Sequence, residues 1–327
     1  MNTRSINLLF LQSRVRDFAI LSGVALGYGL SVRYLPGGYD AFVFYIKAPF
    51  SGTTAPGWVY LCTYPLSLLE WPFGWQILTF VSVIVVGITG MLSGNKRWWG
   101  ALVSAPLLWD IWLGQIEIIP LTGYLLTLLV ITDRIRPMWL GLSWLALLTK
   151  PQVGLGAIVL QIIWWWVINP RKWKELLCAM GIFIGIVTLS ILLWPKWVSD
   201  WLHVMRTFHA TWWNAAIWPY GLLAWPVSIF IATRKVTKPR MQLRTLAASS
   251  LLGSPYFALY HCTTLLAFTE DKFSFLLSWL IILVGKGIPN HWMGWGWLLP
   301  VWVLITDIMN VIRRPTTSEL DLSPAQR

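Results

Sequence analysis

The sequence is poor in charged residues and has no long polar stretch. Only 12% of its 327 residues are charged, whereas about 25% is typical of soluble domains. Hydrophobic residues make up 57% of the chain, and uncharged apolar runs recur from residue 18 almost to residue 312. This pattern excludes an ordinary soluble domain and predicts a polytopic membrane protein. We expect one transmembrane unit over residues 1–314 and a short polar cytoplasmic tail over residues 315–327.

Cysteine is scarce as well. The three cysteines, Cys62, Cys178 and Cys262, are isolated in the sequence and show no CxxC spacing. They therefore predict neither a metal site nor a disulfide framework. Internal repeats of fixed period and low-complexity linkers are also absent, so the sequence gives no sign of a second domain.

The net charge of +12 is best explained by membrane topology. Basic residues gather in clusters along the chain: Arg14 and Arg16; Lys96 and Arg97; Arg134 and Arg136; Arg171, Lys172 and Lys174; Arg234, Lys235, Lys238, Arg240 and Arg244; and Arg313 and Arg314. Successive clusters are separated by enough apolar sequence for an even number of crossings, so all of them can face the cytoplasm, as the positive-inside rule requires. Both termini are then cytoplasmic. The expected partner is the lipid bilayer, and no nucleic-acid partner is expected.

We predict an all-α transmembrane bundle of about 10–12 spans, because a bilayer core admits only helices or closed barrels. The expected apolar segments cover residues 17–33, 73–93, 98–132, 137–169, 176–194, 217–233, 243–269, 273–285 and 293–312. Three of them are broken, near Asp110–Gly114, at Lys150–Pro151 and at Gly253–Pro255. Broken spans of this kind predict a cavity that faces the outer side.

Lys150 is the only charged residue in the apolar run 137–169. As one helix this run would be about 50 Å long, whereas the hydrocarbon core is about 30 Å thick. The segment must therefore turn back, and Pro151 marks the turn. Two interpretations of Lys150 stay open: it faces a cavity with a partner, or it reaches the outer headgroups from a hairpin tip.

Polar residues occur at the other two breaks. The stretch "LLWDIWLGQIEIIPLTGYLL" places Asp110, Gln115 and Glu117 around one break, where they either cap helix ends or line a site. The stretch "LLGSPYFALYHCTTLL" places His261 six residues after Pro255. A histidine there is either a hydrogen-bonded packing residue or a group that changes protonation near neutral pH.

Two outer loops carry further candidates. In "YDAFVFYIKAPF" the spacing of Phe42, Tyr45 and Ile46 suits a short interfacial helix. Asp40 precedes this helix, where it is either its N-cap or a general base at the membrane surface. The loop 196–219 carries Arg206 among tryptophans, which form either an interfacial belt or platforms for sugars.

Taken in order, five motifs resemble those of a known family. They read "YDAFVFY", "TYPLSLLEWPF", "GQIEIIPLTGYLLTLL", "LLTKPQVGLGAIVL" and "GSPYFALYH", and together they extend over residues 40–261. The set resembles the bacterial integral-membrane glycosyltransferases of the C superfamily (GT-C) that use polyprenyl-phosphate-mannose. The chain departs from that pattern in having Leu66 where the family usually has a second proline, and in being shorter than its relatives.

The resemblance implies an inverting hexosyltransferase, mannose being the expected sugar, which acts on the outer side of a bacterial plasma membrane. It implies a polyprenyl-phosphate sugar as donor, a lipid or glycan as acceptor, and no metal or other cofactor. Asp40 is the implied catalytic base. The implied ligands of the donor phosphate are Lys150, His261, Arg206 and Lys47. The candidates for binding the sugar or the acceptor are Gln115, Asp110, Glu117, Tyr45 and Tyr64.

Two alternatives from other functional classes stay open. A flippase or transporter of lipid-linked sugars would share buried charges and broken helices, and paired inverted repeats would favour it. A non-catalytic membrane subunit would fit the short chain. Convergence of Asp40, Lys150 and His261 on one cavity would favour the enzyme.

Overall fold

The computed structural model describes residues 3–46, 56–207, 213–234, 237–285 and 294–313. In these ranges all regular secondary structure is helical, and no strand occurs. The α-helices are α1 (Thr3–Ser31), α2 (Gly57–Ser67), α3 (Phe73–Leu92), α4 (Trp98–Leu102), α5 (Ala105–Leu113), α6 (Ile118–Ile131), α7 (Leu140–Leu147), α8 (Pro151–Ile168), α9 (Trp173–Leu193), α10 (Lys196–Thr207), α11 (Ala224–Thr233), α12 (Pro239–Leu252), α13 (Cys262–Ala267), α14 (Lys272–Gly285) and α15 (Leu298–Ile312). Short 3₁₀ or π turns are η1 (Val32–Tyr34), η2 (Ala41–Ile46), η3 (Pro137–Trp139), η4 (Pro170–Lys172), η5 (Tyr220–Leu223), η6 (Leu259–His261) and η7 (Gly294–Trp297). The predicted all-α class is confirmed.

Five helical stretches are long and apolar enough to cross a bilayer, counted within the described ranges. They are Val15–Tyr34, Phe73–Leu92, Pro151–Ile168, Pro170–Leu193 and Gly294–Ile312. Each has 18 residues or more, and about 20 helical residues match a hydrocarbon core of about 30 Å. Shorter apolar helices pack between and beside them. The protein is therefore a polytopic membrane protein.

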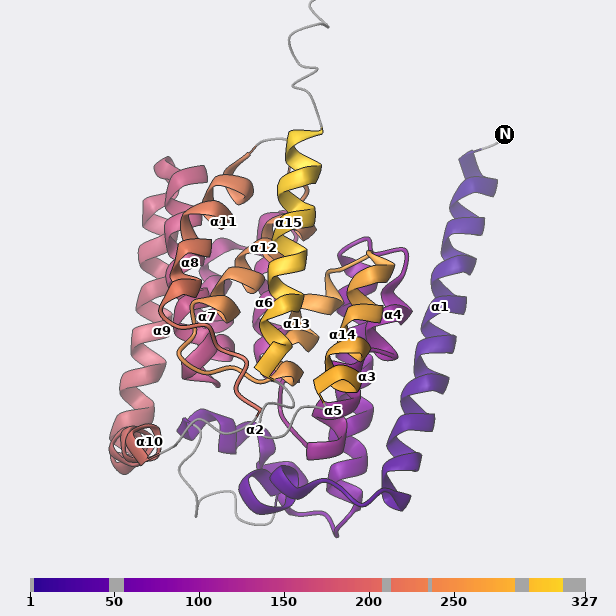
Figure 1. Ribbon diagram of the computed structural model, residues 1–327, viewed down its shortest axis with the longest axis vertical. Coiled ribbons are helices and arrows are strands. Elements are labelled where there is room, and N and C mark those ends of the chain that lie inside the picture. The colour runs from indigo at the N-terminus through magenta and orange to yellow at the C-terminus, as the bar shows by residue number, and fades with distance from the viewer. Residues whose placement is uncertain (1–2, 47–55, 208–212, 235–236, 286–293, 314–327) are drawn as a thin grey trace, which may run out of the picture.

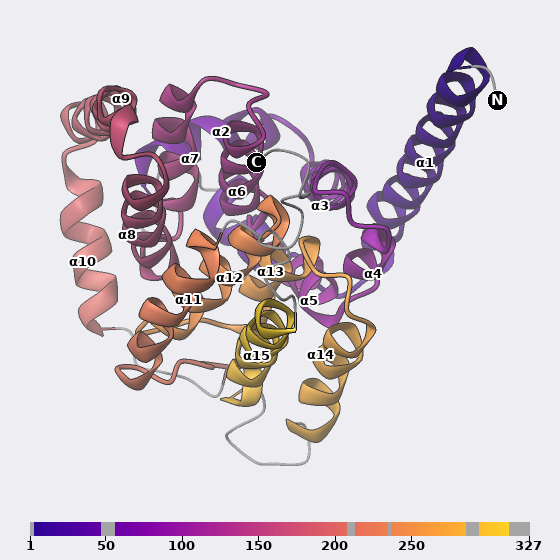
Figure 2. The ribbon, with the colours of Figure 1, turned by 90° about the horizontal axis from the view of Figure 1, so that it is seen from above.

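The two ends of the bundle differ. α1 begins and α15 ends on the same end of the molecule, whereas α2 and α10 lie at the opposite end (Figure 1). Seen from above, α1 leans away from the other helices, and its contacts with the bundle are mainly with α3 (Figure 2). The predicted tail over residues 315–327 lies outside the described residues.

All three predicted breaks are present. Gly114 ends α5 in the left-handed conformation, with φ of +74°, and its N–H bonds the carbonyl of Asp110 at 3.0 Å. A Cβ atom on Gly114 would lie only 2.5 Å from that of Ala41, so glycine also allows this turn to approach the loop before η2. Lys150 separates α7 from α8, and Pro151 occupies the first turn of α8, where its missing N–H costs nothing. α12 ends at Leu252, before the third break.

A buried ion pair connects α12 with α15. The guanidinium of Arg244 pairs with the carboxylate of Asp307, and the hydroxyl of Thr245 donates to the same carboxylate at 2.7 Å. Asp307 is fully buried. Charged groups at this depth usually occur with a partner, and here the partner fixes how α15 packs on α12.

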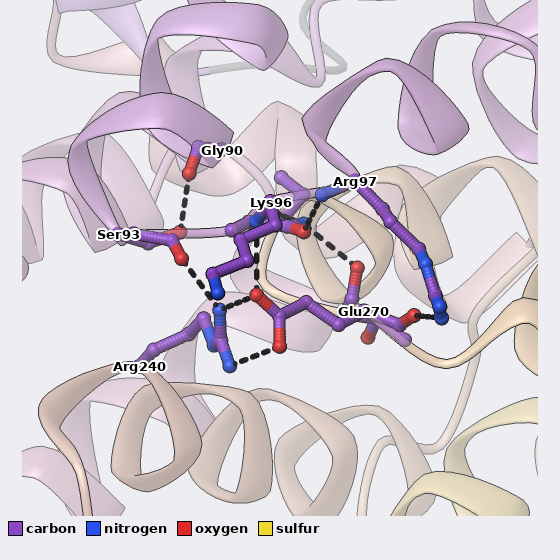
Figure 3. A network of polar contacts seen from close by, with 10 residues as sticks. Gly90, Ser93, Lys96, Arg97, Arg240 and Glu270 are labelled. Carbon is purple, nitrogen blue, oxygen red and sulfur yellow. Dashed lines mark hydrogen bonds and ion pairs between the residues drawn. The ribbon is translucent and has the colours of Figure 1, made fainter.

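A second polar network joins two loops and the start of α12, and it is drawn in Figure 3. Arg240, at the start of α12, donates to both carboxylate oxygens of Glu270, at 2.5 and 2.7 Å. The backbone N–H of Lys96 donates to the same carboxylate at 2.9 Å, and Arg97 donates to the carbonyl of Glu270 at 2.9 Å. The network, which we call the Glu270 clamp (Lys96, Arg97, Arg240 and Glu270), ties the α3–α4 loop to the loop before α14.

Candidate active site

The three helix breaks meet around the ammonium group of Lys150. Its Nζ atom donates to Oε1 of Gln115 at 2.7 Å, forms an ion pair with Oε1 of Glu117, and lies 4.6 Å from the ring centroid of Tyr260. The side chain of Lys150 is only 6% exposed. The hairpin-tip interpretation is therefore wrong, because the ammonium group turns into the protein and finds its partners there.

Gln115 extends this cluster to Asp40. Its Nε2 atom donates to Oδ2 of Asp40, while its Oε1 atom accepts from Lys150. A carboxylate needs a donor and an ammonium group needs an acceptor, so the two neighbours together determine which way the amide points. The side chain of Asp40 thus faces the cluster.

Glu117 and His261 form the deeper part of the cluster. The Nε2 atom of His261 lies 3.7 Å from Oε1 of Glu117, and both side chains are 1% exposed. The backbone N–H of Ala258 donates to Nδ1 of His261 at 3.1 Å. Nδ1 also lies 3.1 Å from the carbonyl oxygen of Ala258, so these two contacts are compatible with either neutral tautomer, and a proton on Nε2 would face Glu117. Glu117 is thus the counter-ion of Lys150, a role that the sequence analysis did not assign.

Asp110 lies beside this group, at the end of α5. It is almost completely buried, and its carboxylate accepts a hydrogen bond from the backbone N–H of Glu117. Both predicted functions of this residue, as a helix-end group and as a member of the site, are compatible with this position.

Burial changes the acid–base behaviour of Asp40, the carboxylate of the cluster that comes from the loop before η2. It raises the pKa of Asp40 from its usual 3.8 to about 6, although the charge of Lys150 and the hydrogen bond from Gln115 lower it in part. A carboxylate with a pKa near 6 remains mostly ionised at neutral pH and is a stronger base than an ordinary aspartate.

Tyr45 and Tyr64 have different positions. Tyr45 lies buried in η2, and Tyr60 lies buried on α2, which packs against η2. Tyr64 is 46% exposed on α2, one turn after the buried Tyr60. The helix periodicity thus places Tyr60, which the sequence analysis did not select, on the side of α2 that faces Tyr45.

The short helix predicted after Asp40 is present as η2, but its predicted apolar face is only partly correct. Tyr45 and Ile46 are buried, whereas Phe42 is 41% exposed. The reason is the wider π-helical turn of Ala41–Ile46, in which the i, i+3 spacing no longer brings residues onto one face.

One of the predicted phosphate ligands, Arg206, is not part of the observed cluster. Arg206 is exposed on α10, a helix at the edge of the bundle beside α9 (Figure 2), and it makes none of the described contacts of the cluster. Lys47 lies outside the described residues. Tyr260, which directly precedes His261 in the chain, is in contact with Lys150.

No group of three or more His, Cys, Asp or Glu side chains in the part of the chain that the structure describes is arranged to hold a metal ion. The cluster brings together the carboxyl groups of Asp40, Asp110 and Glu117, the ammonium group of Lys150 and the imidazole of His261.

Comparison with known proteins identifies one family. A family model described as "Glycosyltransferase family 87" matches residues 56–284. The match covers well over half of the chain and includes Gln115, Lys150 and His261, while Asp40 precedes it. Neither the curated proteins nor the solved structures contain a match to this chain.

Proposed function

We propose that this chain, which belongs to glycosyltransferase family 87, transfers a hexose from a polyprenyl-phosphate carrier to a lipid or glycan acceptor. Mannose is the sugar that we propose first. The observation that carries the proposal is the continuous contact from Asp40 through Gln115 to Lys150. It supplies a base and a cation within one cluster, and a single displacement at the anomeric carbon requires both.

Asp40 acts as the base. It removes the proton from the acceptor hydroxyl, whose oxygen attacks the anomeric carbon and forms the new glycosidic bond. The bond from that carbon to the phosphate oxygen breaks, and the polyprenyl phosphate leaves with the electron pair. One such displacement inverts the anomeric centre. Because the family match begins after Asp40, this role rests on geometry.

Lys150 stabilises the negative charge of the departing phosphate. An ammonium group has three donors, and the acceptors described for Lys150 are Gln115 and Glu117. The third donor serves the phosphate, and a proton on Nε2 of His261 would make that atom a second donor nearby. Preorganised donors of this kind are often the largest contribution to catalysis of group transfer.

The reaction takes place on the extracytoplasmic side of a bacterial plasma membrane. Both ends of the described helical bundle, the start of α1 and the end of α15, lie opposite the end that carries α2 and α10 (Figure 1). The basic clusters follow the positive-inside rule, which assigns the termini to the cytoplasm. The loop with Asp40 precedes α2, so it belongs to the outer end.

Transfer of labelled mannose from polyprenyl-phosphate-mannose tests the proposal, with the purified protein in lipid and with membrane lipid extract as acceptor. We expect the wild type to transfer the sugar and Asp40→Asn to lose about 10²–10⁴-fold in rate. The matched control is Glu70→Gln, which changes an exposed carboxylate in a neighbouring loop and is expected to retain the wild-type rate.

The outcomes separate the alternatives. Equal transfer by wild type and Asp40→Asn would disprove the assignment of the base. If the wild type transfers no mannose, the same assay with polyprenyl-phosphate-glucose and polyprenyl-phosphate-arabinose identifies another donor. Failure with all three donors would favour the non-catalytic subunit.

A further inference from the structure

A groove lined by aromatic side chains lies directly beside Asp40. It has a volume of about 530 Å³, within the range of roughly 300–1,000 Å³ that is usual for small-molecule sites. Its aromatic wall consists of Tyr39, Phe42, Trp71 and Trp112. Tyr39 is 65% exposed and Trp112 is 40% exposed, so their rings are accessible from outside the protein.

The walls of the groove are held in place by the protein itself. Trp71 stacks on the buried Trp75, with ring centroids 5.6 Å apart, and Phe42 meets the edge of Trp71 at 5.0 Å. The indole N–H of Trp112 donates to the carbonyl of Pro36 at 2.8 Å. The ring planes are therefore positioned before any ligand arrives, which lowers the entropic cost of binding.

Two successive glycines form the floor. The N–H of Gly38 donates to the carbonyl of Trp112 at 2.7 Å. A Cβ atom on Gly37 would lie 2.4 Å from that carbonyl oxygen, and a Cβ atom on Gly38 would lie 2.7 Å from the ring of Trp71. Gly38 also has φ of +76°, which side chains disfavour. Only glycine at both positions lets the backbone lie this close to the rings.

The groove and the candidate active site share their two chain segments. Tyr39 lines the groove and Asp40 follows it; Leu113 lines the groove and Gln115 lies two residues further on. Since Gln115 donates to Asp40, the two segments touch at the point where the groove ends and the cluster begins. Asp40 is therefore the chain neighbour of a residue that lines the groove.

The lining selects the class of ligand. None of the residues that line this groove is charged, so it offers nothing to balance the charge of a phosphate or carboxylate. Aromatic faces carry partial negative charge and attract the polarised C–H bonds on the face of a pyranose ring. The groove lies at the end of α5, beside the loop before η2 and the turn between α2 and α3.

We propose that this groove binds a neutral pyranose ring of the acceptor, stacked on Trp112 and Tyr39, with the reacting hydroxyl directed to Asp40. The inference rests on the proposed function for its identification of the ligand as the acceptor. It states that the acceptor presents a sugar ring without charge next to the hydroxyl that is glycosylated.

Binding is measured without transfer. Saturation-transfer difference NMR is recorded on the protein in lipid nanodiscs with methyl α-mannopyranoside, methyl α-glucopyranoside and methyl α-galactopyranoside as separate probes. We expect signal from at least one probe with the wild type and with Asp40→Asn. Tyr39→Ala and Trp112→Leu are expected to weaken its affinity by roughly two- to tenfold each.

A control variant outside the groove and a second groove variant separate loss of the sugar site from general damage to the fold. Trp99→Leu removes a tryptophan that is 55% exposed on α4 and should leave binding unchanged. Tyr39→Ala serves if Trp112→Leu fails to fold, because the tryptophan has a structural hydrogen bond. Absence of binding to all three probes, or equal binding by both groove variants and the wild type, would overturn the inference.

Two further outcomes separate this inference from the proposed function. Displacement of the bound glycoside by geranyl phosphate would assign the groove to the donor chain and overturn the inference. If the probes bind at the groove but no donor supports transfer, the proposed function fails while the sugar site stands. If transfer occurs but no probe binds, the proposed function stands and the inference of a sugar site fails.

Discussion

The Nζ atom of Lys150 donates a hydrogen bond of 2.7 Å to Oε1 of Gln115, across a separation of 35 residues in sequence. This bond leaves Nε2 of the same amide for Asp40. One neutral side chain therefore connects the only ammonium group of the cluster with the carboxylate that we assign as base. The ion pair of Lys150 with Glu117 belongs to the same cluster, and the Glu270 clamp forms a separate polar network.

The rate of transfer should depend on pH through Asp40. A general base acts when it is deprotonated, so activity is expected to be present above its pKa, about 6, and to fall tenfold per pH unit below it. Lys150 lowers this pKa in part, so Lys150→Met should move the acid limb to higher pH. The measurement is kcat/KM from pH 4.5 to 8.5. The donor is a phosphodiester and does not titrate there, and a flat profile would exclude Asp40 as the base.

Gln115→Glu should move the acid limb of the pH profile to higher pH by more than Gln115→Met does. Methionine removes the hydrogen bond that lowers the pKa of Asp40, which moves the limb moderately upward. Glutamate in addition places a negative charge against Asp40, which raises that pKa further. We expect the order wild type, Gln115→Met, Gln115→Glu for the midpoint of the acid limb. Identical midpoints in the three proteins would show that Gln115 does not act on Asp40.

Lys150 and Glu117 should be coupled in stability. Each is buried and each is the ion-pair partner of the other, so removing one leaves an uncompensated charge. Lys150→Met and Glu117→Gln are each expected to cost about 3–5 kcal/mol, and the double variant should cost less than the sum by about 0.5–3 kcal/mol. Unfolding of all four proteins in one detergent measures the coupling. Strict additivity would contradict the pair.

Glu270→Gln should destabilise the protein at neutral pH but not in acid. Burial raises the pKa of Glu270, but the hydrogen bonds from Arg240 and the Lys96 N–H outweigh it, so the pKa lies below its usual 4.5. A lowered carboxylate pKa stabilises the fold above 4.5, and that stability is lost as pH falls through the folded-state pKa. Because the Glu270 side chain is 34% exposed and its interactions are screened by solvent, we expect a cost of about 0.5–1 kcal/mol at pH 7.

The measurement for the Glu270 clamp is the unfolding temperature at pH 7 and at pH 3.5. The difference between Glu270→Gln and wild type should shrink in acid, whereas Glu70→Gln, at an exposed carboxylate, should match the wild type at both values. A difference that is independent of pH would show that the clamp does not depend on the ionised carboxylate.

Much of the fold was predictable from local sequence. The breaks at Lys150–Pro151 and near Asp110–Gly114 were predictable, because proline restricts the backbone dihedral angles and glycine widens their range wherever these residues occur. The length of the apolar runs required those breaks, since the bilayer core is only about 30 Å thick. The sequence left two interpretations of Lys150 open, a cavity with a partner or a hairpin tip at the headgroups, and the structure decided between them.

The contacts themselves were decided by packing. Asp40 and Gln115 are 75 residues apart, and nothing in either segment specifies that they touch. Arg206 was a lesser candidate for binding the phosphate, and it lies exposed on α10. The choice of Tyr60 over Tyr64 for the buried side of α2 likewise depends on how the helix is rotated against η2.

The sequence by itself thus determined the membrane-spanning class, the positions of the breaks and the side of the membrane on which the termini are expected, because hydrophobic length, backbone restriction and charge bias are local properties. The tertiary structure decided which broken segments meet, that Glu117 balances Lys150, and that four aromatic rings from two loops and a helix end form a groove beside Asp40. These features arise from side chains distant in sequence, whose positions depend on the packing of the whole bundle.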